Sequence, residues 1–340
     1  MTHENDYEIE GIQIEELQIL VNTLGERLKI SYPPLHLTLM RIEPGENFYS
    51  VNIQSSREDF GKSGEHNASR AEMPTYDDVS DCLLNSGVIK YCNLNEFEKK
   101  LKTYRSLNRA VCLSPDTNIL YHGFFSNSNL VKTDEILLIN TVRDEIESSL
   151  NYRYDNYQIN ELKKATSFQT KLFDELRNKR TKKSRRAAYL AMHDFRLIRD
   201  KAKTLKPVRE SKPDSRENDI TIIKTLGKHG KESSSLPVLI TADTLITDVC
   251  ETEGVEYFRF TVPHQIESSD CNPKQLRKLV YNLAVLFGFI KLNNIILFGE
   301  YKGKTNPGDL KARFLNTEMF QEFKKELKIC RELVKLGISK

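Results

Sequence analysis

The sequence predicts an α/β protein whose central part contains a mostly parallel sheet flanked by helices. Four short apolar runs, "AVCLS", "ILLIN", "LPVLITA" and "VEYFRF", are continuous rather than alternating, which is typical of parallel strands buried on both faces. Stretches with helical spacing of apolar residues lie between these runs, which gives a βαβα order. In addition, acidic residues closely follow three of the four runs, at the edge of the sheet where ligand sites form.

The composition fits a folded protein of two or three domains. The chain has 340 residues, of which 39% are hydrophobic, and its formal net charge is only +3 although 29% of the residues are charged. This balance argues neither for nor against a nucleic-acid partner. The places where basic residues cluster therefore decide that question.

The N-terminus and the cysteines indicate a reducing compartment. The opening "MTHENDYEIEG" lacks the basic and apolar parts of a signal peptide, and no apolar run approaches the roughly 20 residues of a membrane span. The six cysteines include no CxxC pair, so we expect buried free thiols rather than a zinc site or disulfides. We therefore expect a soluble, cytoplasmic protein with no membrane partner.

The pattern of elements divides the chain into three regions. Residues 1–107 predict an N-terminal α+β region, with a helix that begins near Ile14, strands at "HLTLMRI" and "NFYSVNI", and a helix at "LNEFEKKLKTYRSL". A polar, Gly- and Ser-rich stretch at about 54–78 predicts a flexible loop.

The other two regions follow the same reasoning. Residues 108–262 form the predicted parallel-sheet domain, with a long helical and basic insertion at about 150–210. Residues 263–340 predict a C-terminal α/β extension, with the helix "PKQLRKLVYNLAVLFGFI", the strand "NIILFGEY", a basic turn and a final helix.

Four carboxylates are expected to meet at one edge of the parallel sheet. Asp116 and Asp243 follow the first and third predicted strands, Glu145 lies one turn into the helix after the second strand, and Asp219 opens the helix before the third. Carboxylates gathered in this way repel one another and raise one another's pKa. Mg²⁺ or Mn²⁺ would relieve this repulsion, because both ions prefer carboxylate oxygen and water.

Each acid also has a purely structural interpretation. Asp144 and Asp219 lie near helix starts, where a capping or helix-dipole role is common. Glu147 fits a solvated helix face. Asp116 and Asp243 are harder to explain in this way, because a strand-end acid has no cap to make unless a helix follows at once.

The successive motifs "SPDTNIL", "VRDEIE", "RENDITIIKTL" and "VLITADTLITDVCETEGVEYF" resemble those of the PIN-domain nucleases over about 108–262. The match rests on Asp-x-Asn at Asp116, a Glu in a Val-x-x-Glu context at Glu145, an Asp opening an apolar helix at Asp219, and Thr-x-Asp at Asp243. Two features depart from the family pattern: Ser114-Pro115 precedes the first acid, and the insertion at about 150–210 is long.

The resemblance implies a PIN-like fold and a metal-dependent cut of RNA, usually single-stranded, by water activated between carboxylates. Asp116, Glu145, Asp219 and Asp243 would then be the catalytic residues and would hold Mg²⁺ or Mn²⁺. Asn118 and Thr241 would support the site, and Asp248 is a weaker candidate for a further acid. RNA is the expected partner, with DNA left open.

Other phosphoesterase patterns are incomplete. "HLTL", which begins at His36, contains a His-x-Thr motif like that of the 2H phosphoesterases, but their chemistry needs two copies and the chain has no second one. The Asp-x-Asp of the haloacid dehalogenase-like phosphatases is absent because Asn118 occupies the second position. His36 is therefore expected to be an ordinary strand residue.

Two basic segments are candidate contacts for a phosphate backbone. The first, "RNKRTKKSRR", has no acid among its cations, which are Arg177, Lys179, Arg180, Lys182, Lys183, Arg185 and Arg186. The second, "EYKGKTNPGDLKARF", places Tyr301 and Phe314, which could stack on bases, beside Lys302, Lys304, Lys311 and Arg313. A solvated surface is the structural alternative for both segments.

The function that these patterns predict is a divalent-metal-dependent nuclease, most simply a ribonuclease. Two alternatives stay open: a non-catalytic PIN-like scaffold that binds nucleic acid, and the toxin of a toxin–antitoxin pair. The sequence also leaves homo-oligomer formation open.

Overall fold

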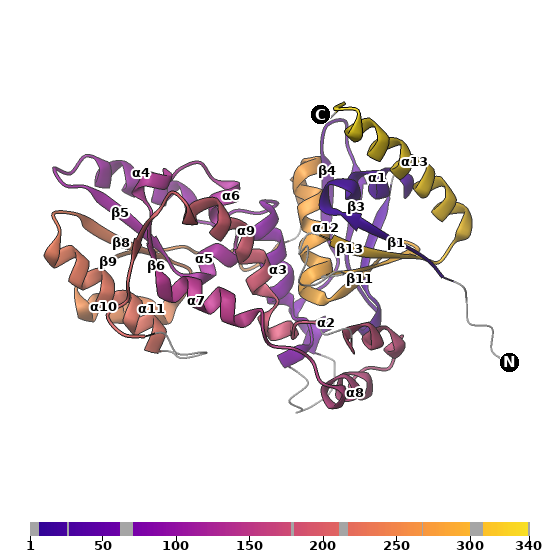
Figure 1. Cartoon of the computed structure of the whole chain (residues 1–340), viewed down its shortest axis with the longest axis horizontal. Helices are drawn as coiled ribbons and strands as arrows, with labels where there is room; N and C mark the ends of the chain where they lie inside the picture. The colour runs from indigo at the N-terminus through magenta and orange to yellow at the C-terminus, as the bar shows by residue number, and fades with distance from the viewer. Residues whose placement is uncertain are drawn as a thin grey trace. The chain divides into compact units, whose positions relative to one another are not determined.

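The chain folds into two compact units (Figure 1). The computed structural model describes residues 7–25, 27–61, 71–177, 180–210, 217–266, 268–299 and 309–338. One unit, here called the antiparallel unit, combines residues 1–82, 153–184 and 266–340; the other, the parallel unit, combines residues 83–152 and 185–265. Within the described residues, no helix has the length and apolar character needed to cross a bilayer.

The antiparallel unit is built on one eight-stranded sheet with the order β1-β13-β12-β11-β2-β3-β4-β10, in which every neighbouring pair is antiparallel. Its strands are β1 (Glu8–Gln13), β2 (Leu28–Tyr32), β3 (Leu37–Pro44), β4 (Tyr49–Ile53), β10 (Ser268–Cys271), β11 (Phe289–Leu292), β12 (Ile295–Phe298) and β13 (Asp309–Phe314). Both ends of the chain thus enter the same sheet, since β1 pairs with β13.

Helices pack against this sheet and complete its core. They are η1 (Ile14–Glu16), α1 (Leu17–Thr23), η2 (Pro33–Leu35), α2 (Arg57–Gly61), α8 (Asn156–Lys164), η5 (Thr170–Arg177), α12 (Pro273–Phe287) and α13 (Thr317–Lys335). Helix α12 contacts β11 and β12, and α13 contacts β13. The start of α12 is fixed by a reciprocal cap between Asn272 and Gln275 and by Pro273 at its first position.

The division expected from the sequence differs from the one found. Residues 1–107 and 263–340 were expected to form separate regions, but their strands alternate within one sheet, and residues 153–184 of the expected insertion join the same unit. Pairings such as β1 with β13 join residues about 300 positions apart. A local pattern of apolar residues cannot predict such distant pairings.

The parallel unit contains the four strands that the sequence predicts and a fifth strand, β7, that it does not. They are β5 (Val111–Pro115), β6 (Leu137–Ile139), β7 (Lys203–Leu205), β8 (Leu236–Thr241) and β9 (Glu256–Arg259). Strands β5, β8 and β9 form one parallel sheet, β6 and β7 another, and a parallel bridge between Leu113 and Ile136 joins the two in the order β7-β6-β5-β8-β9.

Helices cover both faces of these strands. They are α4 (Leu94–Arg105), α5 (Thr117–Tyr121), α6 (Phe124–Asn127), η4 (Thr133–Glu135), α7 (Asn140–Ser149), α9 (Ala187–Arg199), α10 (Glu217–Glu232) and α11 (Thr244–Glu253). Figure 1 shows α4 above the strands, α10 and α11 below them, and α9 to their right beside α5. The expected α/β class, with a parallel sheet flanked by helices, is therefore confirmed. Helix α3 (Tyr76–Ser86) and the short η6 (Lys183–Arg185) lie where the chain passes between the units.

The strand order creates a switch point between β5 and β8. From β5 the chain moves outward to β6 and β7, and it then returns to the other side of β5 to form β8 and β9. At such a reversal the connections leave the carboxyl ends of the two neighbouring strands in opposite directions, which opens a crevice where ligands bind in α/β folds.

Three local expectations need correction. The helical stretch expected in the 150–210 insertion is broken into α8, η5, η6 and α9, and ends in strand β7. The stretch at 54–78 is not a single loop, because it contains α2 and the beginning of α3; its residues 62–70 lie outside the described part. His36 lies in a left-handed turn, with a φ of 52°, immediately before β3 rather than in the strand.

Candidate functional site

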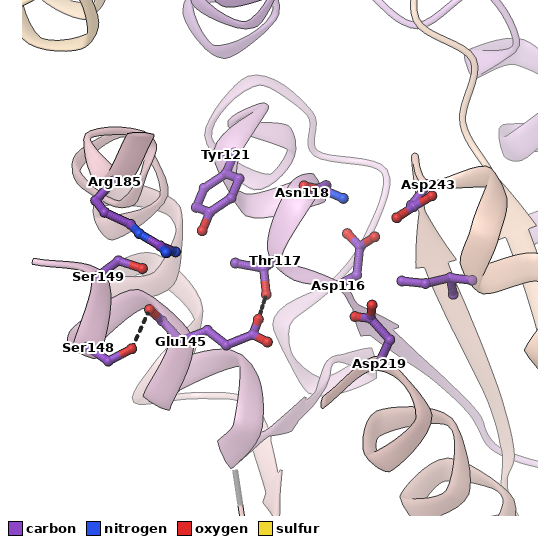
Figure 2. Close-up of a pocket in the computed structure, with 11 residues that line it drawn as sticks. Asp116, Thr117, Asn118, Tyr121, Glu145, Ser148, Ser149, Arg185, Asp219 and Asp243 are labelled. Carbon is purple, nitrogen blue, oxygen red and sulfur yellow. Dashed lines mark hydrogen bonds between the residues drawn. The ribbon is translucent and has the colours of Figure 1, made fainter. Parts of the chain in front are cut away.

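Four carboxylates from four elements of the parallel unit line one cavity at the switch point (Figure 2). The cavity has a volume of about 250 Å³. Its lining comprises Asp116, Thr117, Asn118, Tyr121, Glu145, Ser148, Ser149, Arg185, Asp219, Asp243 and Ile246. The structure thus brings together the four acids expected to converge; their catalytic role stays a prediction.

Asp116 lies directly after β5 and is only 2% exposed. It is the N-cap of α5, and its Oδ1 accepts a hydrogen bond from the Ile119 amide at 2.8 Å. Its Oδ2 accepts a hydrogen bond from the Thr241 hydroxyl. Burial raises the pKa of Asp116 to about 6, although these two donors and His122 oppose the increase.

Asp243 follows β8 in an equivalent position. It caps α11, because its Oδ1 accepts a hydrogen bond from the Leu245 amide at 2.8 Å. The Asp243 amide donates to the Thr241 hydroxyl oxygen at 2.9 Å. Thr241 therefore links the two strand-end acids, in keeping with its expected supporting place. Since a helix follows each strand at once, both acids also have the capping role that the sequence made hard to assign.

Glu145 reaches the cavity from α7. Its carboxylate accepts hydrogen bonds from the Thr117 hydroxyl at 2.5 Å and from the Asn218 amide at 2.9 Å. These donors come from α5 and α10, so three elements fix the position of this acid. Figure 2 shows Thr117 and Glu145 near the middle of the cavity lining.

Asp219, in the first turn of α10, is the acid most affected by its neighbours. Burial and, after it, the charges of Glu145, Asp116 and Asp243 together raise its pKa to about 7. Asp116 is more deeply buried but less shifted, because it accepts hydrogen bonds that favour its charged form. Burial and repulsion between the carboxylates therefore disfavour the charged forms of Asp116 and Asp219.

The chemistry of these donors fits a hard divalent cation. The lining offers carboxylate, amide and hydroxyl oxygens, the ligands that Mg²⁺ and Mn²⁺ prefer, and no imidazole or thiol. As the side chains stand, however, no three His, Cys, Asp or Glu side chains within the described residues are grouped closely enough to hold one ion. Asp116, Glu145 and Asp243 instead accept hydrogen bonds from neighbouring donors.

Several lining residues were missed in the sequence. Tyr121, Ser148, Ser149 and Ile246 line the cavity about one helical turn after Asn118, Glu145 and Asp243, the expected site residues of α5, α7 and α11. This spacing places them on the same helix face as those residues. The spacing of three or four residues could therefore have identified these lining residues. It can be used only once the helices are known to begin directly at the strand ends.

Three other acids do not take part. Asp248 is exposed on α11 and does not line the cavity, so the structure gives it no supporting place. Glu147 pairs with Arg143 on an exposed face of α7, as its structural interpretation anticipated. Asp144 is exposed within α7, and the helix already begins at Asn140, so the capping interpretation of Asp144 is wrong.

The first basic segment is largely engaged in the fold. Arg177 contacts Asp174 at 3.1 Å, Arg180 contacts Glu175 at 3.6 Å, and Lys183 contacts Asp78 at 2.6 Å. The absence of acids within the run was therefore a poor guide, because Asp174 and Glu175 lie just before it and Asp78 comes from a distant segment. Arg186 is buried, Lys182 is half-buried, and Lys179 lies outside the described residues. Only Arg185, among the described cations of this segment, lines the cavity.

The second basic segment is also less available than expected. Lys311 lies 2.6 Å from Glu175, Arg313 lies 4.0 Å from the same carboxylate, and both cations lie over the ring of Phe298. Phe314 is only 2% exposed, which rules out base stacking on its ring. Tyr301, Lys302 and Lys304 lie outside the described residues.

No known protein-family model and no curated protein matches this chain.

Proposed function

We propose that this protein is a divalent-metal-dependent nuclease that hydrolyses phosphodiester bonds, with single-stranded RNA as its first candidate substrate. One observation carries the proposal: four carboxylates from four separate elements line one cavity at the switch point of the parallel sheet. The resemblance of the motifs in residues 108–262 to those of PIN-domain nucleases supports the same conclusion, and implies a PIN-like fold for this unit.

The electrostatics of the cavity support a cation as its natural occupant. Asp116, Glu145, Asp219 and Asp243 would hold Mg²⁺ or Mn²⁺, and the bound ion would supply positive charge for the phosphate and a more acidic water. The elevated pKa values of Asp116 and Asp219 mean that part of the site holds protons near neutral pH. A cation would displace those protons and remove the repulsion between the acids.

The residues around the acids would keep the site ordered. Thr241 holds Asp116 and Asp243 in a fixed relation, while Thr117 and Asn218 hold Glu145. Asn118 lines the same space and offers a neutral oxygen ligand.

The size of the cavity favours a single strand. About 250 Å³ is less than the space in which drug-sized ligands bind, so the cavity admits a short stretch of backbone rather than a double helix.

The direct test is cleavage of end-labelled single-stranded RNA, and of DNA of the same sequence, with Mg²⁺, with Mn²⁺ and with excess EDTA. The proposal predicts products with either metal and none with EDTA. Full cutting in EDTA would overturn the metal requirement. Binding without cutting under every condition would instead favour the non-catalytic scaffold.

A further inference from the structure

The cavity has two chemically distinct ends. Asp116, Asp219 and Asp243 gather at one end, while Arg185 and Tyr121 lie at the other (Figure 2). The guanidinium of Arg185 and the hydroxyl of Tyr121 extend toward the same space. A guanidinium in the lining would repel a bound cation, so cation binding alone does not explain the presence of Arg185.

Arg185 is held in place by its surroundings. Its guanidinium lies over the ring of Tyr152, 4.8 Å from the ring centroid, which is a cation–π arrangement. The next residue, Arg186, is buried and anchors the start of α9. A guanidinium fixed in this way is well suited to a phosphate, because its planar fork matches two phosphate oxygens.

The Ser148 and Ser149 hydroxyls surround the same end of the cavity. Ser148 donates to the carbonyl of Glu145 at 3.1 Å, which fixes its position near the last turn of α7. Ser149 lies beside it in the lining, below the guanidinium of Arg185 in Figure 2. This end therefore combines one positive charge with neutral hydroxyl groups, which is the composition of a phosphate site rather than a cation site.

The phosphate that Arg185 reaches is not the one at the acids. In Figure 2, Glu145 and Thr117 lie between Arg185 and Asp116. A strand whose reacting phosphate lies at the carboxylates therefore presents a different phosphate to Arg185. We propose, resting on the nuclease function argued above, that Arg185 binds the phosphate next to the scissile one, so that the substrate is a single strand with a phosphate beside the cut.

The test compares three small substrates that differ only in their terminal phosphates. They are a dinucleotide without terminal phosphates and the same dinucleotide with a 5′- or with a 3′-phosphate. The proposal predicts that one terminal phosphate raises kcat/KM about tenfold or more over the plain dinucleotide, as expected for a charge-assisted contact. The end that matters identifies the side of the cut on which Arg185 acts.

The decisive quantity is the ratio of kcat/KM with and without that terminal phosphate. Arg185→Gln should reduce the ratio to about one, whereas Arg143→Gln, which removes an exposed guanidinium from α7 outside the cavity, should leave it unchanged. A ratio that survives in Arg185→Gln, or a wild-type ratio of one, would overturn the inference. If Arg185 only neutralised Glu145, the variant would slow every substrate equally and the ratio would persist.

A binding measurement separates this inference from the nuclease proposal. Labelled single-stranded pentanucleotide is titrated into the full chain carrying Asp116→Asn, with and without Arg185→Gln, over a range of salt concentrations. Loss of one phosphate contact should reduce the salt slope by about 0.7. Equal slopes, or no binding, would refute the Arg185 contact whether or not the wild type cuts. A wild type that cuts nothing but shows the slope difference would refute only the nuclease.

Discussion

Two sets of acidic residues, one in each unit, occupy opposite electrostatic settings. In the antiparallel unit, Glu175 lies 2.6 Å from Lys311, and Asp78 lies 2.6 Å from Lys183. In the parallel unit, Asp116, Asp219 and their neighbours share a cavity with other carboxylates. Aspartate and glutamate side chains are therefore paired with cations in the first set and clustered with one another in the second. The carboxylates paired with cations of the chain stabilise the fold, whereas the clustered carboxylates with raised pKa values are the ones that we propose to bind a cation.

The largest expected effect is at Asp116. Asp116→Asn should reduce cleavage of single-stranded RNA at least about a hundredfold, because it removes the most buried carboxylate of the cluster. Its folding should be intact or slightly more stable at pH 8, since burial penalises the charged form. Gel-based cleavage and thermal melting measure the two effects. Retained turnover with normal melting would place the site elsewhere.

The counterpart in the antiparallel unit is Glu175, whose side chain is 11% exposed and lies close to Lys311, Arg180 and Arg313. Glu175→Gln should lower the free energy of unfolding by about 3 kcal/mol, because it leaves buried cations without their carboxylate. Urea denaturation gives this value. If the free energy of unfolding fell by less than about 0.5 kcal/mol, the pairing of Glu175 with these cations would not stabilise the fold, and the contrast with the clustered acids would be wrong.

Asp219 should give a smaller effect of the opposite sign. Its pKa of about 7 in the folded chain lies above the ordinary value of 3.8, so the folded state holds its proton more tightly than the unfolded state. Wild-type stability should therefore fall as pH rises between those values, and Asp219→Asn should avoid that loss.

The variant should accordingly match the wild type near pH 4 and exceed it by about 1 kcal/mol at pH 8, a figure reduced for the partial exposure of Asp219. Denaturation curves across this range measure the difference. A variant less stable than the wild type at pH 8 would show that Asp219 makes favourable contacts that outweigh the repulsion.

The smallest effect is expected at Asp248, an exposed acid of α11 outside the cavity. Asp248→Asn should change cleavage by less than about twofold and stability by less than about 0.5 kcal/mol, as is usual for surface substitutions. It is the matched control for Asp116→Asn. A strong loss of cleavage would mean that Asp248 acts on the reaction from outside the cavity.

The two units also differ in how far the sequence predicted them. In the parallel unit, the apolar runs at β5, β6, β8 and β9 matched the strands, and the acids after β5 and β8 met as expected, because both follow from a local pattern and a general rule about strand ends. The sheet of the antiparallel unit could not be foreseen. Its strands come from both ends of the chain, and the pairing of β1 with β13 leaves no local trace.

Charge patterns were the least reliable guide. The run from Arg177 to Arg186 contains no acid, yet Asp174, Glu175 and Asp78 pair with three of its cations in the folded chain. The surroundings of a basic residue in the fold do not follow from the run alone. Arg185 lines the cavity, yet nothing in the run distinguishes it from the cations beside it.

The central claim is that the carboxylate cluster is a cation site, and a calorimetric titration with Mn²⁺ at pH 6.5 tests it most directly. Performed in two buffers with different ionisation enthalpies, the titration also counts the protons released on binding. Because Asp116 and Asp219 have pKa values of about 6 and about 7, the account predicts saturable binding with release of about one proton, reduced in Asp219→Asn. Absence of saturable binding, or binding with no proton release, would contradict it.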